Sequence, residues 1–162
     1  MRKKTILCKN VFDGILMNST FWGYMLLIVF LVIVNVLEAQ SVFNSSNMMV
    51  GKIEIDGTVR DRNNMMIGIF ESDGDVRDKN YMLVGKIERG GTIRDKNYML
   101  LGKVDPDGTV KDKNNMMIGK VKSDGTVVDR NNMTIGYARG IDIKQVAVFF
   151  FFKLFHSNPM ND

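Results

Sequence analysis

The sequence is poor in the residues that most often carry chemistry. Its 162 residues include one cysteine, Cys8, and one histidine, His156, near opposite ends of the chain. A single cysteine this close to the start excludes a disulfide, a thiolate nucleophile or a thiolate metal site in the rest of the chain. A lone histidine beside a polar terminus offers neither a histidine metal cluster nor a supported catalytic triad. We therefore expect no cofactor, no metal and no enzymatic activity.

The chain also has little excess charge once its first segment is set aside. Four of its 22 basic residues and two of its 18 acidic residues lie in residues 1–39, which leaves a net charge of +2 on the remainder. A nearly neutral body does not indicate a nucleic-acid partner, in spite of the overall pI of about 9.2. Partners other than nucleic acid stay open, among them an envelope protein or a glycan.

The first segment has the pattern of a secretory signal peptide. A basic start with Arg2, Lys3 and Lys4 precedes an apolar run over residues 21–37, and Ala39 precedes a polar stretch. This order predicts export with cleavage after Ala39, and an uncleaved signal anchor is the alternative. The expected location is periplasmic, cell-surface or secreted, with membrane contact only through an uncleaved leader.

The body of the chain is one 17-residue unit written five times, from residue 48 to residue 132. The copies read MMVGKIEIDGTVRDRNN, MMIGIFESDGDVRDKNY, MLVGKIERGGTIRDKNY, MLLGKVDPDGTVKDKNN and MMIGKVKSDGTVVDRNN, and a sixth copy begins at Met133 and stops after Tyr137. A unit this short cannot bury a core alone, so neighbouring units must stack or close on one another. The glycines and the Asn-Asn pairs exclude a helix, and two apolar stretches with two turns per unit predict a β-hairpin.

A three-residue loop fits the first turn of each unit. It pairs the apolar residue before the turn with the apolar residue after it in all five copies, for example Ile53 with Val59, and places Pro106 second in a type I turn. The last loop residue then needs a positive φ, which explains five structural glycines: Gly57, Gly74, Gly91, Gly108 and Gly125.

The same register sets the central glycine of each unit, such as Gly51, opposite an aspartate. These aspartates are Asp61, Asp78, Asp95, Asp112 and Asp129. We interpret them as caps that accept backbone N–H bonds in the second turn; the alternative is a polar ring around a symmetry axis. Positions 1 and 3 of each unit face the other way, so a second apolar side needs a cover. The Phe-rich segment 146–155 is predicted to fold back over the face that carries Ile67, Val84, Leu101 and Ile118.

Several residues invite a functional interpretation. Acidic turns such as Asp105-Pro106-Asp107-Gly108 resemble calcium loops but carry too few carboxylates for one. The repeated methionines, from Met48 to Met133, are interpreted as core filling, with an adaptable binding surface as the alternative. Candidate ligand contacts at the second turn are Tyr81, Tyr98, Asn64, Asn115 and Asn132.

The repeat and the chain end together resemble a known family. Units of the form (I/V)-G-K-(I/V)-x-x-D-G-T-V-(R/K)-D-(K/R)-N-N, an exported leader ending in Ala-Gln, and the closing IGYARG and AVFFFFKLF stretches are similar to the five-fold β-flower proteins of bacteria. The resemblance covers residues 40–155. It implies an all-β fold of five tandem hairpin repeats in a five-fold β-flower-like arrangement with a Phe-rich C-terminal cap, and it implies no activity.

The expected organisation follows from these patterns. It comprises a leader (1–39), a linker (40–47), a hairpin-repeat domain of five and a half units (48–137), a hydrophobic cap (138–155) and a disordered tail (156–162). We expect an exported structural or protein-interaction module at the cell envelope. The alternative is a glycan- or small-ligand-binding module that uses the repeated turn tips.

Overall fold

The computed structural model describes Tyr24, Leu27, residues 40–152, and residues 154 and 155. The chain divides into two compact units, Met1–Glu38 and Ala39–Asp162, and the description below concerns the second. The predicted leader, apart from Tyr24 and Leu27, and the predicted disordered tail lie outside the described residues. In the described part of the chain, no helix is both long enough and apolar enough to cross a bilayer.

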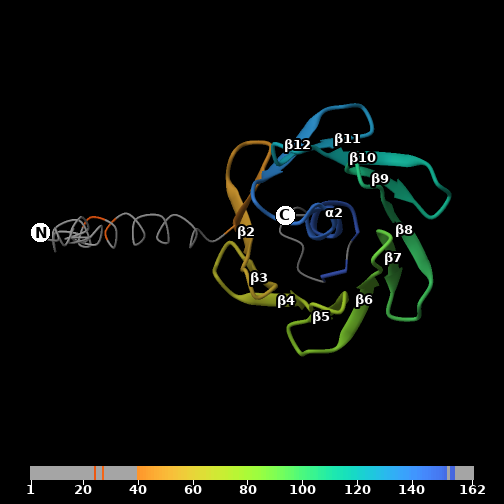
Figure 1. Cartoon of the computed structure of the whole chain (residues 1–162), viewed down its shortest axis with the longest axis horizontal. Coiled ribbons are helices and arrows are strands. Elements are labelled where there is room, and N and C mark those ends of the chain that lie inside the picture. Colours follow the sequence, from red (N-terminus) through yellow and green to blue (C-terminus); the bar gives the residue numbers. More distant parts are fainter. Residues whose placement is uncertain (1–23, 25–26, 28–39, 153, 156–162) are drawn as a thin grey trace, which may run out of the picture. The chain divides into compact units, whose positions relative to one another are not determined.

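Twelve strands form one closed antiparallel barrel in the order of the chain, and β1 pairs with β12 to complete the circle (Figure 1). The strands are β1 (Gln40–Asn44), β2 (Met49–Ile53), β3 (Thr58–Asp61), β4 (Met66–Phe70), β5 (Asp75–Asp78), β6 (Leu83–Ile87), β7 (Thr92–Asp95), β8 (Leu100–Val104), β9 (Thr109–Asp112), β10 (Met117–Val121), β11 (Thr126–Asp129) and β12 (Thr134–Ala138). The predicted all-β arrangement of hairpin repeats is confirmed. Because the unit closes its own sheet around its own core, it has what a domain needs to fold alone.

The pairing inside each repeat is the predicted one. Ile53 lies opposite Val59 and Gly51 lies opposite Asp61, and the other four repeats keep this register. The five loop glycines have φ between 83° and 92°, which is the left-handed conformation that the three-residue loop requires. The residues that follow these loops, from Val59 to Val127, are fully buried and line the barrel interior.

A sixth unit closes the ring, and the two ends of the chain form it. Asn44 of β1 lies opposite Gly136 of β12, just as an aspartate lies opposite a glycine inside each repeat. The predicted linker 40–47 is therefore wrong: residues 40–44 are a strand, and residues 44–48 form the same turn as the other five units. The signal was present in the sequence, because SVFNSSNM follows the pattern of TVRDRNNM. This sixth unit has no Gly loop. Its strand β1 begins at Gln40, and after β12 the chain turns at Gly140 toward helix α2 in the interior.

The assignment of faces needs one correction. In every repeat the register shifts by one residue beside the central glycine; for example, Val59 pairs with Gly68 but Arg60 pairs with Met66. The skipped residue, Ile67, is a β-bulge, and a bulge lets two consecutive side chains approach the same side of a sheet. Position 3 of each unit thus packs into the interior beside the glycine, and not on an opposite face.

The interior is filled by the C-terminal segment. Helix α2 (Ile143–Phe151) begins at Asp142, whose side chain accepts the backbone N–H groups of Lys144 and Gln145, and the helix lies at the centre of the ring (Figure 1). The segment shares one core with the strands, in which Ile67 is buried and Val84, Leu101 and Ile118 are partly buried. The predicted fold-back of residues 146–155 onto these four residues is confirmed, although the sequence pattern did not predict a helix there.

Each of the six central glycines lies under a different side chain of this segment. A Cβ atom on Gly136 would lie 2.5 Å from Phe150, and one on Gly119 would lie 2.4 Å from Phe151. Around the ring the pairs are Gly51 with Phe149, Gly136 with Phe150, Gly119 with Phe151, Gly102 with Phe152, Gly85 with Leu154 and Gly68 with Phe155. Successive apolar residues of the segment therefore contact successive units of the barrel. Glycine is required because a Cβ atom at each of these positions would lie 2.2–2.6 Å from a backbone carbonyl oxygen of the neighbouring strand, and at five of the six also less than 3 Å from the covering side chain.

Candidate functional site: the turn tips at one end of the barrel

The two ends of the barrel are built from different turns. Because neighbouring strands run in opposite directions, the five Gly loops lie together at one end, called the loop end here, and the six Asp/Asn turns lie together at the other. These six turns, which span residues 44–48, 61–65, 78–82, 95–99, 112–116 and 129–133, are called the tips. Their outward-facing surface is the tip rim.

The first residue of each tip holds the turn together. Oδ1 of Asp61 accepts the backbone N–H groups of Asn63 and Met65, each at 2.9 Å, and the other four aspartates make the equivalent bonds. Asn44 does the same with its amide oxygen at 3.0 Å. The predicted capping role of the aspartates is confirmed. The side chains that cover the central glycines are apolar ones of the C-terminal segment, five phenylalanines and Leu154, so the alternative of a polar ring is wrong.

The fourth residue of each tip adopts the left-handed conformation. Four tips use asparagine there, and two use tyrosine. These residues are Asn47, Asn64, Tyr81, Tyr98, Asn115 and Asn132, with φ between 60° and 65°. Asparagine visits this conformation readily, whereas a bulky side chain does so at a cost. All the candidate ligand contacts named from the sequence therefore sit at equivalent positions, and Asn47 is the member that sequence reasoning missed.

Tyr81 and Tyr98 have 63% and 61% of their surface exposed, so packing does not compensate for this backbone conformation. Replacing both with asparagine is expected to raise the free energy of unfolding by about 0.5–1 kcal/mol per site, since asparagine is the less strained residue there. Chemical denaturation of the double variant beside the wild type measures the gain. The reverse change in a neighbouring tip, Asn115→Tyr, is the control and should lower stability by a similar amount. A double variant that is less stable than the wild type would contradict the strain argument.

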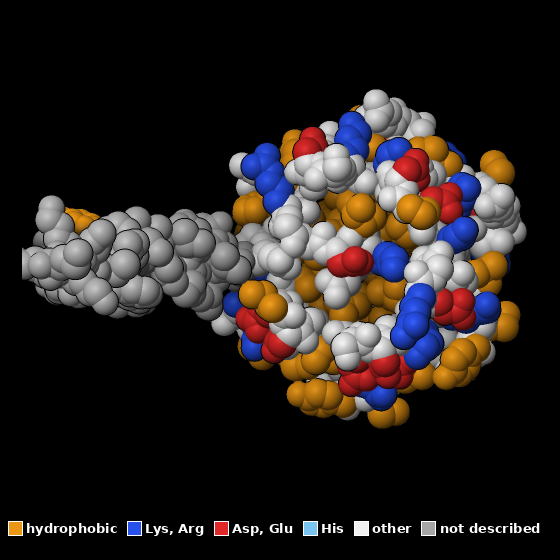
Figure 2. Space-filling model, viewed as in Figure 1, with side chains coloured by type: hydrophobic (Ala, Val, Ile, Leu, Met, Phe, Trp, Pro, Cys, Tyr) orange, Lys and Arg blue, Asp and Glu red, His pale blue; other side chains and the backbone are white. Residues whose placement is uncertain are grey.

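The interpretation of the methionines as core residues is wrong for the last residue of each tip. Met48, Met65, Met82, Met99, Met116 and Met133 are between 61% and 66% exposed. No methionine belongs to the buried core among the described residues. Figure 2 shows hydrophobic side chains in separate patches around the outer edge of the unit. Each methionine follows the left-handed residue, and the turn directs its side chain outward. Hydrophobic character alone therefore predicted burial where the side chain is exposed.

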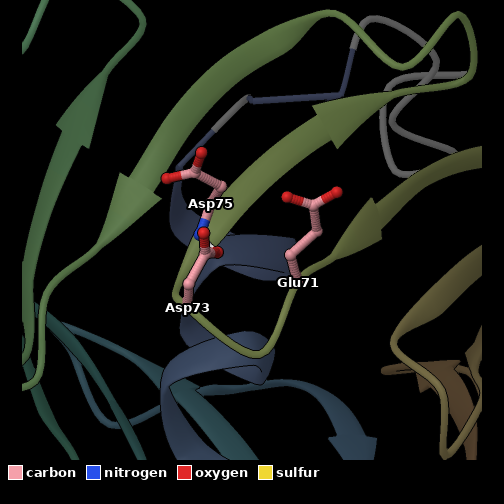
Figure 3. A group of neighbouring side chains, drawn as sticks. All are labelled: Glu71, Asp73 and Asp75. Atoms are coloured by element: carbon pink, nitrogen blue, oxygen red, sulfur yellow. Dashed lines mark hydrogen bonds between the residues drawn. The ribbon is translucent and has the colours of Figure 1, made fainter.

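The loop end has a different chemistry. Glu71 and Asp73, on the loop between β4 and β5, and Asp75, the first residue of β5, bring carboxylate oxygens within 4.8 Å of one another (Figure 3). Arg77 binds Glu71 at 3.0 Å, Lys86 and Arg77 both bind Asp75, and Asp73 accepts the backbone N–H of Asp75. These ion pairs and the turn cap account for the three carboxylates as parts of the loop itself.

Two cavities open at the loop end around the start of α2. They measure about 290 and 310 Å³ and share Arg89, Asp142 and Lys144 in their walls. The Lys144 Nζ atom donates to the carbonyl oxygen of Arg89 at 3.2 Å, which ties the helix to the loop between β6 and β7. This contact gives Lys144 a structural role at the mouth of the barrel.

A third cavity, of about 410 Å³, lies at the tip end. Val84, Leu101, Phe151, Phe152 and Leu154 form its apolar wall, and Asp95 and Lys96 of one tip border it. The tip end therefore combines exposed apolar tips with a largely apolar recess behind them, whereas four charged residues border one loop-end cavity and six border the other.

Comparison with known proteins supports the fold and adds no activity. No curated protein and no solved structure matches the chain. Residues 35–154 match the family described as 5-fold beta-flower protein. In this chain five tandem repeats are joined by a sixth unit that the two ends complete. The match spans most of the chain, so this protein belongs to the 5-fold beta-flower family.

Proposed function

We propose that the protein is exported and acts by contact, as a structural or protein-interaction module at the cell envelope, with the tip rim as its contact surface. The observation that carries this proposal is the set of six equivalent tips, each with an exposed methionine held by an aspartate or asparagine cap. Exposed apolar groups that gather on one surface are typical of interaction sites. Six weak equivalent contacts on one rigid ring would reinforce one another.

The arrangement favours contact over catalysis. Histidine and cysteine are absent from the described residues 40–152, 154 and 155. The carboxylates of the barrel stabilise turns or form ion pairs. The tip aspartates cap their turns, and Glu54 binds Lys52 and Arg60, each at 3.0 Å. These two cations lower the pKa of Glu54, which keeps it ionised and makes it a poor general acid at neutral pH.

Site-specific photo-crosslinking in native cells tests the contact surface. A benzophenone amino acid replaces Tyr98, which is 61% exposed at the tip end, and in a matched control replaces Ile55, which is 73% exposed at the loop end. We expect discrete adducts with an envelope component, protein or lipid, from position 98 and none from position 55. Equal adducts from both positions, or none from either, would contradict the proposal. Mass spectrometry of the same native protein tests export, since the expected N-terminus is Gln40.

A glycan-binding module is the second candidate, and the two tyrosines support it. Tyr81 and Tyr98 occupy neighbouring tips, stay exposed, and keep a backbone conformation that asparagine would adopt at lower cost. Strain that the fold does not need is often kept for a function. A glycan array compares the wild type with the Tyr81→Asn/Tyr98→Asn variant, whose turns match those of the four asparagine tips. Binding that this variant loses would favour the candidate; no binding by either protein would exclude it.

A further inference from the structure

Exposed apolar side chains gather almost entirely at one end of the barrel. In the part of the second unit that the structure describes, eleven of the twelve exposed large hydrophobic residues lie at the tips or on the strand residue that follows them. They are Met48, Met49, Met65, Tyr81, Met82, Tyr98, Met99, Leu100, Met116, Met117 and Met133. The twelfth, Ile55, lies at the loop end. The barrel is therefore amphipathic along its axis.

Exposed charges are also distributed unequally along the barrel axis: cations lie at the tips and mainly anions lie at the loop end. Each of the five tips inside a repeat carries one exposed cation: Arg62, Lys79, Lys96, Lys113 and Arg130. The aspartates of these tips are only partly exposed, and their Oδ1 atoms face the backbone N–H groups that they cap. The described tips thus present exposed cations without an exposed anion.

The loop end presents mainly anions. Its exposed charged residues are Asp56, Asp73, Asp107, Asp124 and Asp142 against Arg89, Lys103 and Arg139, and Lys103 pairs with Asp105 at 3.2 Å. The backbone N–H of Thr58 lowers the pKa of Asp56, and Lys120 together with Thr109 lowers the pKa of Asp107. These carboxylates consequently stay charged well below neutral pH, so the difference in charge between the tip end and the loop end persists there.

We propose that the tip rim docks on a lipid bilayer that contains anionic headgroups, with the loop end facing away. The inference rests on the proposed role of the tips as the contact surface at the envelope, and it names the component that they contact. Methionine, leucine and tyrosine side chains enter the interfacial layer, while the tip lysines and arginines bind headgroup phosphates. Tyrosine is favoured at such interfaces because its ring is apolar and its hydroxyl stays hydrated.

A second copy of the chain fits the rim poorly. Two rims placed face to face would bring five exposed cations against five others, which is repulsive. A head-to-tail stack would satisfy the charges, but among the described residues the loop end offers only Ile55 as an exposed large hydrophobic partner for the eleven on the rim. A fluid bilayer meets both requirements, because it supplies negative charge at its surface and hydrocarbon beneath it.

The bilayer contact can be measured with a tryptophan reporter, because the one tryptophan of the sequence, Trp22, lies in the leader. In the chain that begins at Gln40, Tyr98→Trp is then the sole tryptophan, and Ile55→Trp is the loop-end control. The emission of the Tyr98→Trp variant is expected to shift to shorter wavelength on vesicles of phosphatidylglycerol and phosphatidylcholine, and not on phosphatidylcholine alone. The control is expected to stay unchanged on both. Equal shifts at both positions, or none at position 98, would overturn the proposal.

Variants of the rim separate its two contributions in a vesicle flotation assay. Lys96→Gln and Lys113→Gln are each expected to weaken binding to the anionic vesicles about fivefold, since a basic residue near such a surface contributes roughly that factor. Met82→Ser/Met99→Ser should weaken binding further, and Ile55→Ser should leave it unchanged. Binding that these rim variants leave intact would contradict docking through the tips.

The assays also distinguish this inference from the proposed function. Protein adducts from position 98 in cells, without vesicle binding, would overturn the lipid contact and leave the contact module standing. Association of the chain with itself in the absence of vesicles, lost in the same rim variants, would assign the rim to a second copy and overturn the lipid contact. Neither adducts nor vesicle binding would overturn both.

Discussion

Removing residues 146–162 is expected to leave a chain that cannot form the ring. The deletion takes away most of α2 and the side chains of Phe149, Phe150, Phe152, Leu154 and Phe155, all of which are buried. Each buried side chain of this size contributes about 1.5–3 kcal/mol, so the five together contribute about 7.5–15 kcal/mol, which is comparable with the roughly 5–15 kcal/mol by which a whole domain is stable. Circular dichroism and the soluble fraction after expression measure the outcome.

A single substitution tests the same contact in a chain that still folds. Phe150→Ala is expected to lower the free energy of unfolding by about 3–5 kcal/mol, since Phe150 is 8% exposed and covers Gly136. Ile55→Ala at the exposed loop end is the control, with a change of no more than about 0.5 kcal/mol. A soluble deletion variant with an unchanged melting temperature would show that the segment does not support the barrel.

Gly91→Ala is expected to cost about 3 kcal/mol of stability. Gly91 has φ of +83°, and a Cβ atom there would lie 2.0 Å from the carbonyl oxygen of Val104. The left-handed conformation costs a residue with a side chain about 1–2 kcal/mol, and the displacement of a neighbouring strand adds about 1–3 kcal/mol. Denaturant unfolding of the purified variant measures the sum.

The preceding residue supplies a matched control in the same loop. A Cβ atom added to Gly90 would meet no heavy atom within 4 Å, and Gly90 does not adopt a positive φ. Gly90→Ala should leave stability unchanged or raise it by up to about 1 kcal/mol, because alanine restricts the unfolded chain. Similar losses from Gly90→Ala and Gly91→Ala would show that the loop requires glycine for reasons other than its backbone conformation.

The strand register could be predicted from the sequence because all five repeats must share it, so each possible pairing can be tested in five copies. The pairing of Ile53 with Val59 places apolar beside apolar in every copy, and a shift of one residue would pair the first of these with Arg60. The closure of the ring was harder to predict. Residues 40–47 contain no Gly loop, and their resemblance to half a repeat becomes clear only when Asn44 is aligned with the aspartate of the repeat and Asn47 with its later asparagine.

The sequence did not predict the helix or the exposure of the tip methionines, and each failure has a physical reason. Consecutive phenylalanines such as Phe149 and Phe150 show no helical period, because the helix is surrounded by the barrel and is apolar on most sides. The tip methionines resemble core residues in composition, and only the turn geometry turns Met65 or Met99 outward. The candidate tip residues Asn64, Tyr81 and Tyr98 were identifiable because they recur at one position, but their left-handed backbone was not part of that prediction.

The pairing of six glycines with six side chains of the C-terminal segment also sets the size of the ring. In an array of similar repeats, contacts between neighbouring repeats do not fix the number of repeats, since each added copy forms the same contacts with the next. Here the centre supplies one apolar side chain for each unit, from Phe149 over Gly51 to Phe155 over Gly68. A chain that gained or lost one 17-residue unit would keep its junctions and lose this match. Repeat number and the length of the final segment must therefore change together in evolution.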